Sequence, residues 1–220
     1  MSYESDTRDA YRNKTKANAY KNQYIEGFKW ARFTMWKQKK IIFEFLNVCK
    51  LGSSDVLLDI PCGTGYIGGL LSKYPFKVVA SDISIEMMEL AINEYSENNF
   101  TGFLQADITK TPFQADQFKC VVVLALMHRL PREVRAQVLS EVVRVTNEYI
   151  IISYSIESFL QKLKLKLISL VSSNHIPAPE SIPLKDIINE IDSYGLIVIR
   201  RKRIVSLLSS KVVFLAKKAL

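Results

Sequence analysis

The sequence contains few of the groups that hold metals or form disulfides. Its 220 residues include only two histidines and three cysteines, Cys49, Cys62 and Cys120. The cysteines are odd in number, with neither C-x-x-C spacing nor a neighbouring histidine cluster, which argues against a disulfide framework and a zinc site. We expect three reduced, mostly buried thiols and no metal.

Long apolar runs are also missing. No stretch of 18 or more apolar residues occurs, and the polar start MSYESDTRDAYRNKTK has no apolar h-region. Neither a membrane span nor a secretory signal is therefore predicted. Because 48% of the residues are hydrophobic and 24% are charged, the composition excludes intrinsic disorder and predicts a folded domain. We expect a soluble, cytoplasmic protein.

Acidic residues are scarce at both ends of the chain. The formal net charge is +8, with 11 Lys/Arg against 5 Asp/Glu in residues 1–50 and 11 against 4 in residues 161–220, but 8 against 13 in residues 51–160. The basic tracts lack the interleaved aromatics of a nucleic-acid groove. We therefore rank a solvated basic face first, an anionic substrate or acidic membrane surface second, and nucleic acid a distant third.

The middle of the chain alternates strand and helix patterns. Short apolar runs predict strands at 55–60, 77–83, 100–107, 119–126 and 149–154, and helical spacing predicts helices at 66–73, 84–96 and 131–146. This alternation predicts a Rossmann-like, doubly wound α/β sheet that is mostly parallel.

The two ends of the chain depart from this rhythm. Residues 20–50 predict a helical segment whose apolar face includes Ile41, Phe45 and Val48. Near the C-terminus, a helix at 184–194 capped by Gly195 precedes two strands at 196–204 and 211–219. Those strands have no room for a crossover helix between them, so they must pair antiparallel.

The segment before those elements is ambiguous. Residues 159–171 fit both a strand and a helix, with helix favoured, and residues 172–183 hold three prolines and predict a loop. We accordingly divide the chain into an N-terminal helical cap, 1–50, and a core, 51–220, with a lid-like insertion near 155–183.

A glycine-rich turn follows the first predicted strand. Gly63, Gly65 and Gly68 form a G-x-G-x-x-G pattern between a strand and a helix, and Asp82 ends the next strand. Together, the string VLLDIPCGTG at 56–65, SDIS at 81–84 and QADI at 105–108 resemble the class I S-adenosylmethionine-dependent methyltransferases. The resemblance covers roughly residues 55–155 and is to the quinone-biosynthesis-like, small-molecule branch.

This resemblance implies a site for S-adenosylmethionine at the carboxyl ends of the strands. Gly63 and Gly65 would let the backbone approach the cofactor, Asp59 would hold the loop or the cofactor ammonium, and Asp82 would accept hydrogen bonds from both ribose hydroxyls. The expected neighbours of the adenine and of the methyl donor are Ile83, Met87, Asp107, the N–H of Ile108, and Leu124. Each aspartate alone could be a helix or turn cap, but their shared position at strand ends favours a ligand.

Two further residues have open alternatives. Arg32, in RFTMWKQK at 32–39, lies in a segment similar to one that precedes the core in quinone-biosynthesis-type methyltransferases. It would bind the cofactor carboxylate, or it is a surface arginine. His128, in ALMHRLP, would take the acceptor proton as a catalytic base, or it is a loop histidine that shapes the pocket.

The predicted function is metal-independent methyl transfer by in-line displacement, with catalysis mainly by positioning. The expected acceptor is a small molecule or lipid precursor, anionic or amphipathic. Lys162, Lys164 and Lys166 would either touch an acidic membrane surface or only solvate the protein surface, and the second interpretation ranks slightly ahead. Two alternatives remain: a nicotinamide-dependent reductase that uses the same glycine turn, and a non-catalytic cofactor-binding partner subunit. Asp107 and the terminal antiparallel pair speak against the reductase.

Overall fold

A seven-stranded sheet forms the centre of the protein. The computed structural model describes residues 15, 17–19, 21, 29–157, 181–206 and 209–219. The strand order is β3-β2-β1-β4-β5-β7-β6. The strands are β1 (Val56–Asp59), β2 (Lys77–Asp82), β3 (Phe100–Gln105), β4 (Phe118–Val123), β5 (Thr146–Ser155), β6 (Leu196–Arg203) and β7 (Lys211–Lys218). The predicted fold class is confirmed.

The sheet combines a parallel part with an antiparallel edge. Strands β1 to β5 pair parallel, and β7 pairs antiparallel with both β5 and β6. In the β5–β7 register, Ser155 at the end of β5 lies opposite Lys211 at the start of β7. The start of β7 therefore lies at the sheet edge where the parallel strands end.

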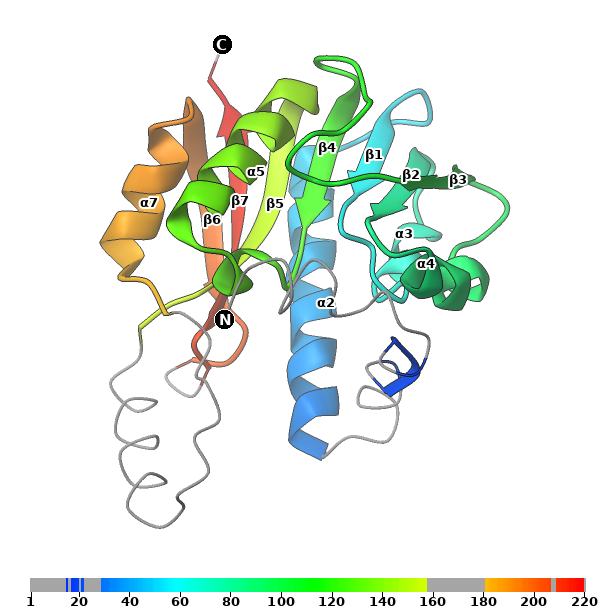
Figure 1. The fold of residues 1–220 in the computed structure, drawn as a ribbon, viewed down its shortest axis with the longest axis horizontal. Coiled ribbons are helices and arrows are strands. Elements are labelled where there is room, and N and C mark those ends of the chain that lie inside the picture. The colour runs from blue at the N-terminus through cyan, green and yellow to red at the C-terminus, as the bar shows by residue number, and fades with distance from the viewer. Residues whose placement is uncertain are drawn as a thin grey trace.

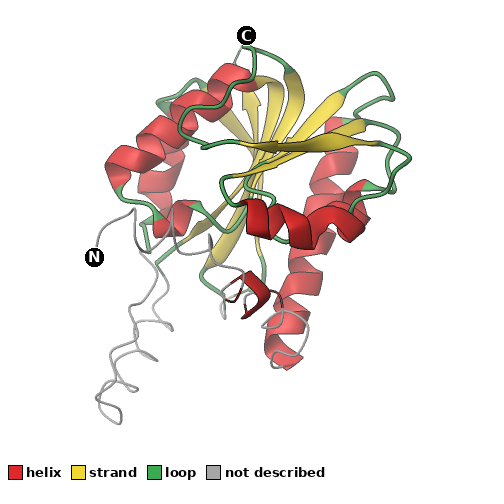
Figure 2. Cartoon of the chain, turned by 45° about the vertical axis from the view of Figure 1, so that its right-hand side comes forward, coloured by secondary structure: helices red, strands yellow, loops and turns green. Residues whose placement is uncertain are grey.

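Helices cover both faces of the sheet (Figures 1 and 2). One face packs against α2 (Lys29–Cys49), α3 (Gly68–Leu71) and α4 (Ile85–Ala91), which continues into the 3₁₀ turn η2 (Ile92–Glu94); the other packs against α5 (Arg132–Val145) and α7 (Leu184–Asp192). A second 3₁₀ turn, η3 (Met127–Arg129), follows β4. Figure 1 shows the first half of α2 extending beyond the edge where β1 and β4 end.

Helix α2 buries two of its three predicted apolar positions. Ile41 and Phe45 are buried as expected, but Val48 is 39% exposed. The buried positions of the helix fall three and four residues apart, as one face requires, and they are Gln38, Ile41, Ile42, Phe45, Leu46 and Cys49. After Phe45 the next inward position is Cys49, four residues on. Val48, three residues on, points away from the buried face.

Helix α3 is one turn long, much shorter than the predicted 66–73. Gly68 and Gly69 open it, and glycine costs helix stability because of its backbone freedom. Gly68 is nevertheless required, since a Cβ there would lie 2.4 Å from the carbonyl oxygen of Glu94. Close packing against η2 therefore takes precedence over helix propensity.

Several predictions fall on residues that the structure does not describe. The helix favoured at 159–171, with Lys162, Lys164 and Lys166, lies outside the described residues, as does the loop expected at 172–183 apart from its last three residues. Among the residues that are described, no helix is long and apolar enough to cross a membrane. The membrane contact stays a prediction.

Candidate active site

The glycine turn after β1 assigns different tasks to its first two glycines. Gly63 and Gly65 both have positive φ, 54° and 76°, which favours glycine. A Cβ on Gly65 would lie 2.7 Å from the Cβ of Glu94, whereas a Cβ on Gly63 would meet no atom within 4 Å. Gly65 therefore permits packing of the turn on η2, and Gly63 borders open space.

Asp82 ties this turn to the end of β2. Its Oδ2 accepts a hydrogen bond from the Gly63 N–H at 2.8 Å, and its Oδ1 accepts one from the Ser84 N–H at 3.0 Å. Burial raises the pKa of the Asp82 carboxyl, and the backbone N–H donors oppose that effect. Since a carboxylate offers about four acceptor positions, Asp82 can hold the turn and still accept from a ligand.

Asp59, at the end of β1, is a second buried carboxyl at the same edge. It is 2% exposed and accepts a hydrogen bond from the Tyr95 hydroxyl at 2.6 Å. Burial raises the pKa of Asp59 to about 7, the Tyr95 hydrogen bond opposes this, and the charge of Asp82 adds to it. Asp59 therefore changes charge near neutral pH, and a cation beside it would stabilise the ionised form.

These residues line one pocket at the carboxyl edge of the parallel strands. Six of the predicted site residues line it: Asp59, Gly63, Asp82, Ile83, Met87 and Leu124. Helix α2 forms another wall through Thr34, Met35 and Gln38. The Tyr66 hydroxyl, which follows the glycine turn, donates to the backbone oxygen of Met35 at 2.6 Å and fixes that wall.

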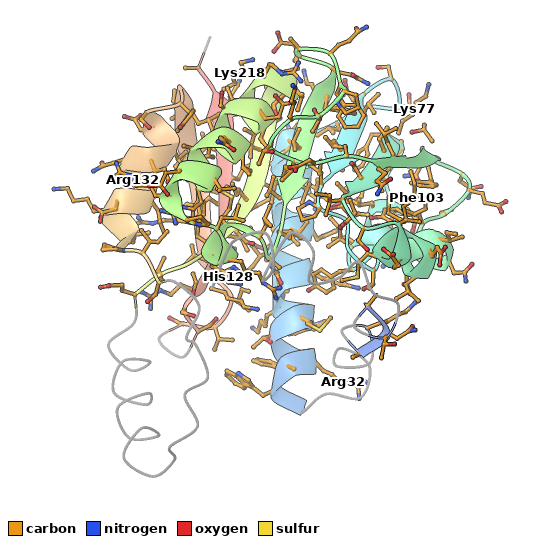
Figure 3. The ribbon with its side chains drawn as sticks, viewed as in Figure 1. Arg32, Lys77, Phe103, His128, Arg132 and Lys218 are labelled. Atoms are coloured by element: carbon orange, nitrogen blue, oxygen red, sulfur yellow. The ribbon has the colours of Figure 1, made fainter. Side chains whose placement is uncertain are left out.

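Five predicted site residues are not among those that line the pocket: Arg32, Gly65, Asp107, Ile108 and His128. Arg32 is exposed, and Figure 3 shows it on the part of α2 that extends beyond the sheet. The Asp107 carboxylate accepts from the N–H and hydroxyl of Thr109, at 2.9 and 2.7 Å, which closes a local turn. Ile108 is buried in the apolar cluster of the α5 and α7 face.

His128 lies in η3, next to the pocket wall. It is 9% exposed, and burial together with the positive charges of Lys211 and Arg129 lowers its pKa to about 4. The imidazole is therefore neutral at pH 7 and a weak base. Its role as a catalytic base stays a prediction.

Two cations that the sequence analysis did not single out line the pocket: Arg129 and Lys211. His128 was singled out because it follows the fourth predicted strand. Arg129 is the next residue, so the same argument could have predicted it as a pocket residue. Lys211 had no such signal, because only the antiparallel pairing of β7 with β5 places it at this edge. Ala125, which follows β4, also lines this pocket and has a positive φ of 55°. Its N–H donates a hydrogen bond to the hydroxyl of Ser153 in β5 at 2.8 Å.

Cys62 is the one cysteine of the three that lines the pocket, and all three are buried free thiols. Burial and the charges of Asp82 and Asp59 hold the pKa of the Cys62 thiol well above its usual range. A thiol is a poor nucleophile when it stays protonated. Within the described residues, no three His, Cys, Asp or Glu side chains group as metal ligands would.

Part of the chain is similar to known methyltransferases. Residues 57–148 match the family described as a methyltransferase domain. A malonyl-[acyl-carrier protein] O-methyltransferase of Marinomonas sp. (strain MWYL1) is 33% identical over 79 residues, which is 35% of this chain and 29% of that protein. A probable ribosomal RNA small subunit methyltransferase A of Pyrococcus abyssi (strain GE5 / Orsay) is 26% identical over 56% of this chain and 43% of that protein. The matches thus span less than half of either relative.

Solved structures share the whole fold. Magnesium protoporphyrin IX methyltransferase of Synechocystis PCC 6803, with bound S-adenosylhomocysteine, superposes with a TM-score of 0.78 at 18% identity, covering 99% of this chain and 100% of that one. A TehB-like S-adenosylmethionine-dependent methyltransferase of Corynebacterium glutamicum superposes with a TM-score of 0.62 at 16% identity, covering 93% and 96%. These similarities, well below 25% identity, are similarities of fold.

Proposed function

We propose that this chain transfers the methyl group of S-adenosylmethionine to a small-molecule or lipid-precursor acceptor, because residues 57–148 match the methyltransferase-domain family and its fold is shared with S-adenosylmethionine-dependent methyltransferases. The observation that carries this proposal is the link between Asp82 and the Gly63 N–H at 2.8 Å, in a pocket that Asp59 also lines. It places two carboxyls and an open glycine at one strand edge, where ligands of open α/β sheets bind.

The residues of this pocket fit the cofactor. The open space beside Gly63 admits the close approach of a ligand to the backbone. The remaining acceptor positions of Asp82 suit the two ribose hydroxyls, and Ile83 and Met87 supply apolar walls for the adenine. Asp59 suits the cofactor ammonium, which would favour its ionised form.

The protein contributes to the chemistry by positioning the acceptor beside the methyl group and by excluding water. S-Adenosylmethionine supplies a sulfonium-activated methyl group, which transfers by in-line displacement. Leu124 and Leu126, after β4, present apolar surface where the acceptor would approach. Holding the acceptor at near-attack distance between these side chains and α2 lowers the entropic part of the barrier. Because the His128 pKa is about 4, the acceptor atom we expect is one that needs little help in losing a proton.

Isothermal titration calorimetry with S-adenosylhomocysteine and with NADPH tests the proposal. We expect the first to bind and the second not to bind, whereas tighter binding of NADPH would favour the reductase. In Asp82→Ala, the loss of the charged acceptor should weaken S-adenosylhomocysteine binding by about 1–3 kcal/mol. Asp192→Ala, a change of the same type at an exposed position of α7, is the control that should keep wild-type affinity.

A methyl-transfer assay with tritiated S-adenosylmethionine then separates an enzyme from a non-catalytic partner subunit. It is run on carboxylic acids, phenols, amines and thiols with apolar bodies. Labelled product from one class, absent with Asp82→Ala, supports the enzyme. Cofactor binding with no product from any class would favour the partner subunit.

A further inference from the structure

The basic end of the pocket, formed by Arg129 and Lys211, has no role in cofactor binding as described above. Resting on the proposed function, we infer that these two side chains bind an anionic group of the methyl acceptor, so that the acceptor is an amphipathic anion. Arg129 comes from η3 after β4, and Lys211 from the first position of β7. Both line the same pocket as Asp59 and Asp82.

The two cations lie close enough together to influence each other's charge. Local desolvation and then repulsion from Arg129 lower the pKa of Lys211, although the residue as a whole is exposed, and both cations lower the pKa of His128. In the described part of the chain, no carboxylate lies within ion-pair distance of the Lys211 ammonium. By contrast, Lys217 and Lys218 on the same strand pair with Glu148 and Asp116.

This arrangement suits an anion from outside the chain. Two like charges in one pocket repel each other, and charge-assisted hydrogen bonds to a bound anion offset that repulsion. An arginine and a lysine together supply the donors for one carboxylate or phosphate. The ion pairs of β7 lie at its other end, at Lys217 and Lys218, whereas Lys211 lines the pocket with no carboxylate of the described residues in ion-pair range.

The position of the cations favours the acceptor over the cofactor as the source of that anion. The sheet order places β2 and β1, with Asp82 and Asp59, on one side of the pocket, and β4, β5 and β7 on the other. Leu124 and Leu126 lie on the cationic side, at the strand after which the acceptor is expected. The cofactor's own carboxylate is the competing source, because it could reach the same cations from the other side.

The walls beside the cations indicate the rest of the acceptor. Leu126 and Ile204 are apolar neighbours of Arg129 and Lys211 in the pocket lining, and Met35 of α2 lines the same pocket. A ligand that satisfies both the charges and these walls has a charged head and an apolar body. A purely polar anion would leave the apolar walls exposed to water, at a cost proportional to their area.

Octanoate and its neutral isostere octanamide are the probes for this site. Binding of each is measured by calorimetry in the presence of saturating S-adenosylhomocysteine. Wild-type protein should bind octanoate at least about tenfold more tightly than octanamide, as expected for a hydrogen-bonded charge. In Lys211→Gln and Arg129→Gln this preference should fall severalfold or vanish.

Two controls keep the result specific. Lys77→Gln makes the same change at an exposed lysine that starts β2, distant from His128 (Figure 3), and should keep the wild-type preference. Arg129→Lys retains the charge, and its preference for octanoate should exceed that of Arg129→Gln, which would separate a loss of charge from a loss of packing.

The outcomes distinguish this inference from the proposed function. If wild-type protein does not bind S-adenosylhomocysteine, the proposed function fails. If that binding is intact but octanoate and octanamide bind equally, the acceptor is not held by its charge and the inference is overturned. A fall of tenfold or more in S-adenosylhomocysteine affinity in Lys211→Gln would assign the cations to the cofactor carboxylate and overturn it as well.

Discussion

The two ends of the pocket differ in charge and in how their groups are held. At the acidic end, Asp59 and Asp82 follow strands β1 and β2, and each accepts hydrogen bonds from the protein, from Tyr95 to the first and from Gly63 and Ser84 to the second. At the basic end, Lys211 has no acidic partner within the described residues, and His128 is buried beside it. The acidic end is therefore preorganised, whereas the Lys211 ammonium at the basic end has no counter-charge in the part of the chain that the structure describes.

Burial has opposite consequences at the two ends. It raises the pKa of Asp59 to about 7 and lowers the pKa of His128 to about 4. Both groups are shifted toward their neutral forms, because a low-dielectric pocket disfavours charge of either sign. A positive centre near Asp59 would stabilise its ionised form, and a negative group near Lys211 would offset the positive charge there. This is the charge pattern expected of the cofactor together with an anionic acceptor.

Removal of the buried acid should give the largest change in stability. An unfolded Asp titrates near about 3.9, whereas the Asp59 pKa in the folded protein is about 7. Between these values the folded state holds a proton that the unfolded chain has released, so stability falls as the pH rises. Above pH 7 the full cost approaches about 4 kcal/mol, since one pKa unit is worth about 1.4 kcal/mol.

Asp59→Asn should therefore be more stable than wild type at pH 8, by up to that amount, and equal to it below about pH 4. Urea unfolding of the cofactor-free protein across this range measures the difference. An equal stability of the two proteins at pH 8 would show that Asp59 ionises without cost. In wild type, S-adenosylmethionine should also bind more tightly as the pH rises through 7, an increase that Asp59→Asn should lack.

The basic end should respond to pH in the opposite sense. An unfolded histidine titrates near about 6.5, and the His128 pKa in the folded protein is about 4. Between these values the unfolded chain binds a proton that the folded state lacks, so stability is lost as the pH falls. The loss approaches about 3 kcal/mol at pH 4, and His128→Gln should remove it.

The His128 titration can be followed by nuclear magnetic resonance of the ring protons. With two histidines in the sequence, the His128→Gln variant assigns the signals. Lys211→Gln should raise the His128 pKa, because it removes one of the two cations that lower it, whereas Lys77→Gln should leave it unchanged. A His128 signal that titrates near 6.5 in wild type would contradict the buried, cation-flanked position.

The smallest expected changes in stability come from alanine substitutions at the two glycines beside the acidic end, Gly63 and Gly65. Gly65→Ala places a Cβ 2.7 Å from Glu94 and adds strain at positive φ, so thermal unfolding should show a loss of about 2 kcal/mol. Gly63→Ala adds only the strain, about 1 kcal/mol, but its methyl group enters the open space beside the backbone. Its main effect should be weaker S-adenosylhomocysteine binding, and a variant that loses stability without losing affinity would remove Gly63 from the site.

The parts of the site that were predictable from sequence are those that depend on local patterns. Asp59 and Asp82 each end an apolar run, and the run itself indicates the strand end where ligands of such sheets bind. Ser84 was expected to start a helix, and its hydroxyl does cap α4 by accepting from the Met87 N–H. Asp107 also follows a strand, but its carboxylate accepts hydrogen bonds from Thr109, two residues on, and so closes a turn. The position after a strand therefore did not show whether Asp107 lines the pocket.

The amino-acid sequence alone determined the order of strands and helices, the glycine turn and the acidic residues beside it, because each depends on neighbours within a few positions. The tertiary structure decided which face of α2 is buried, that Gly65 serves packing while Gly63 borders the pocket, and that Lys211 joins Arg129 there. These features require contacts between segments distant in the chain, such as the pairing of Ser155 with Lys211. Burial by such contacts also sets the pKa values of Asp59 and His128, since desolvation depends on everything packed around a group and not on its sequence neighbours.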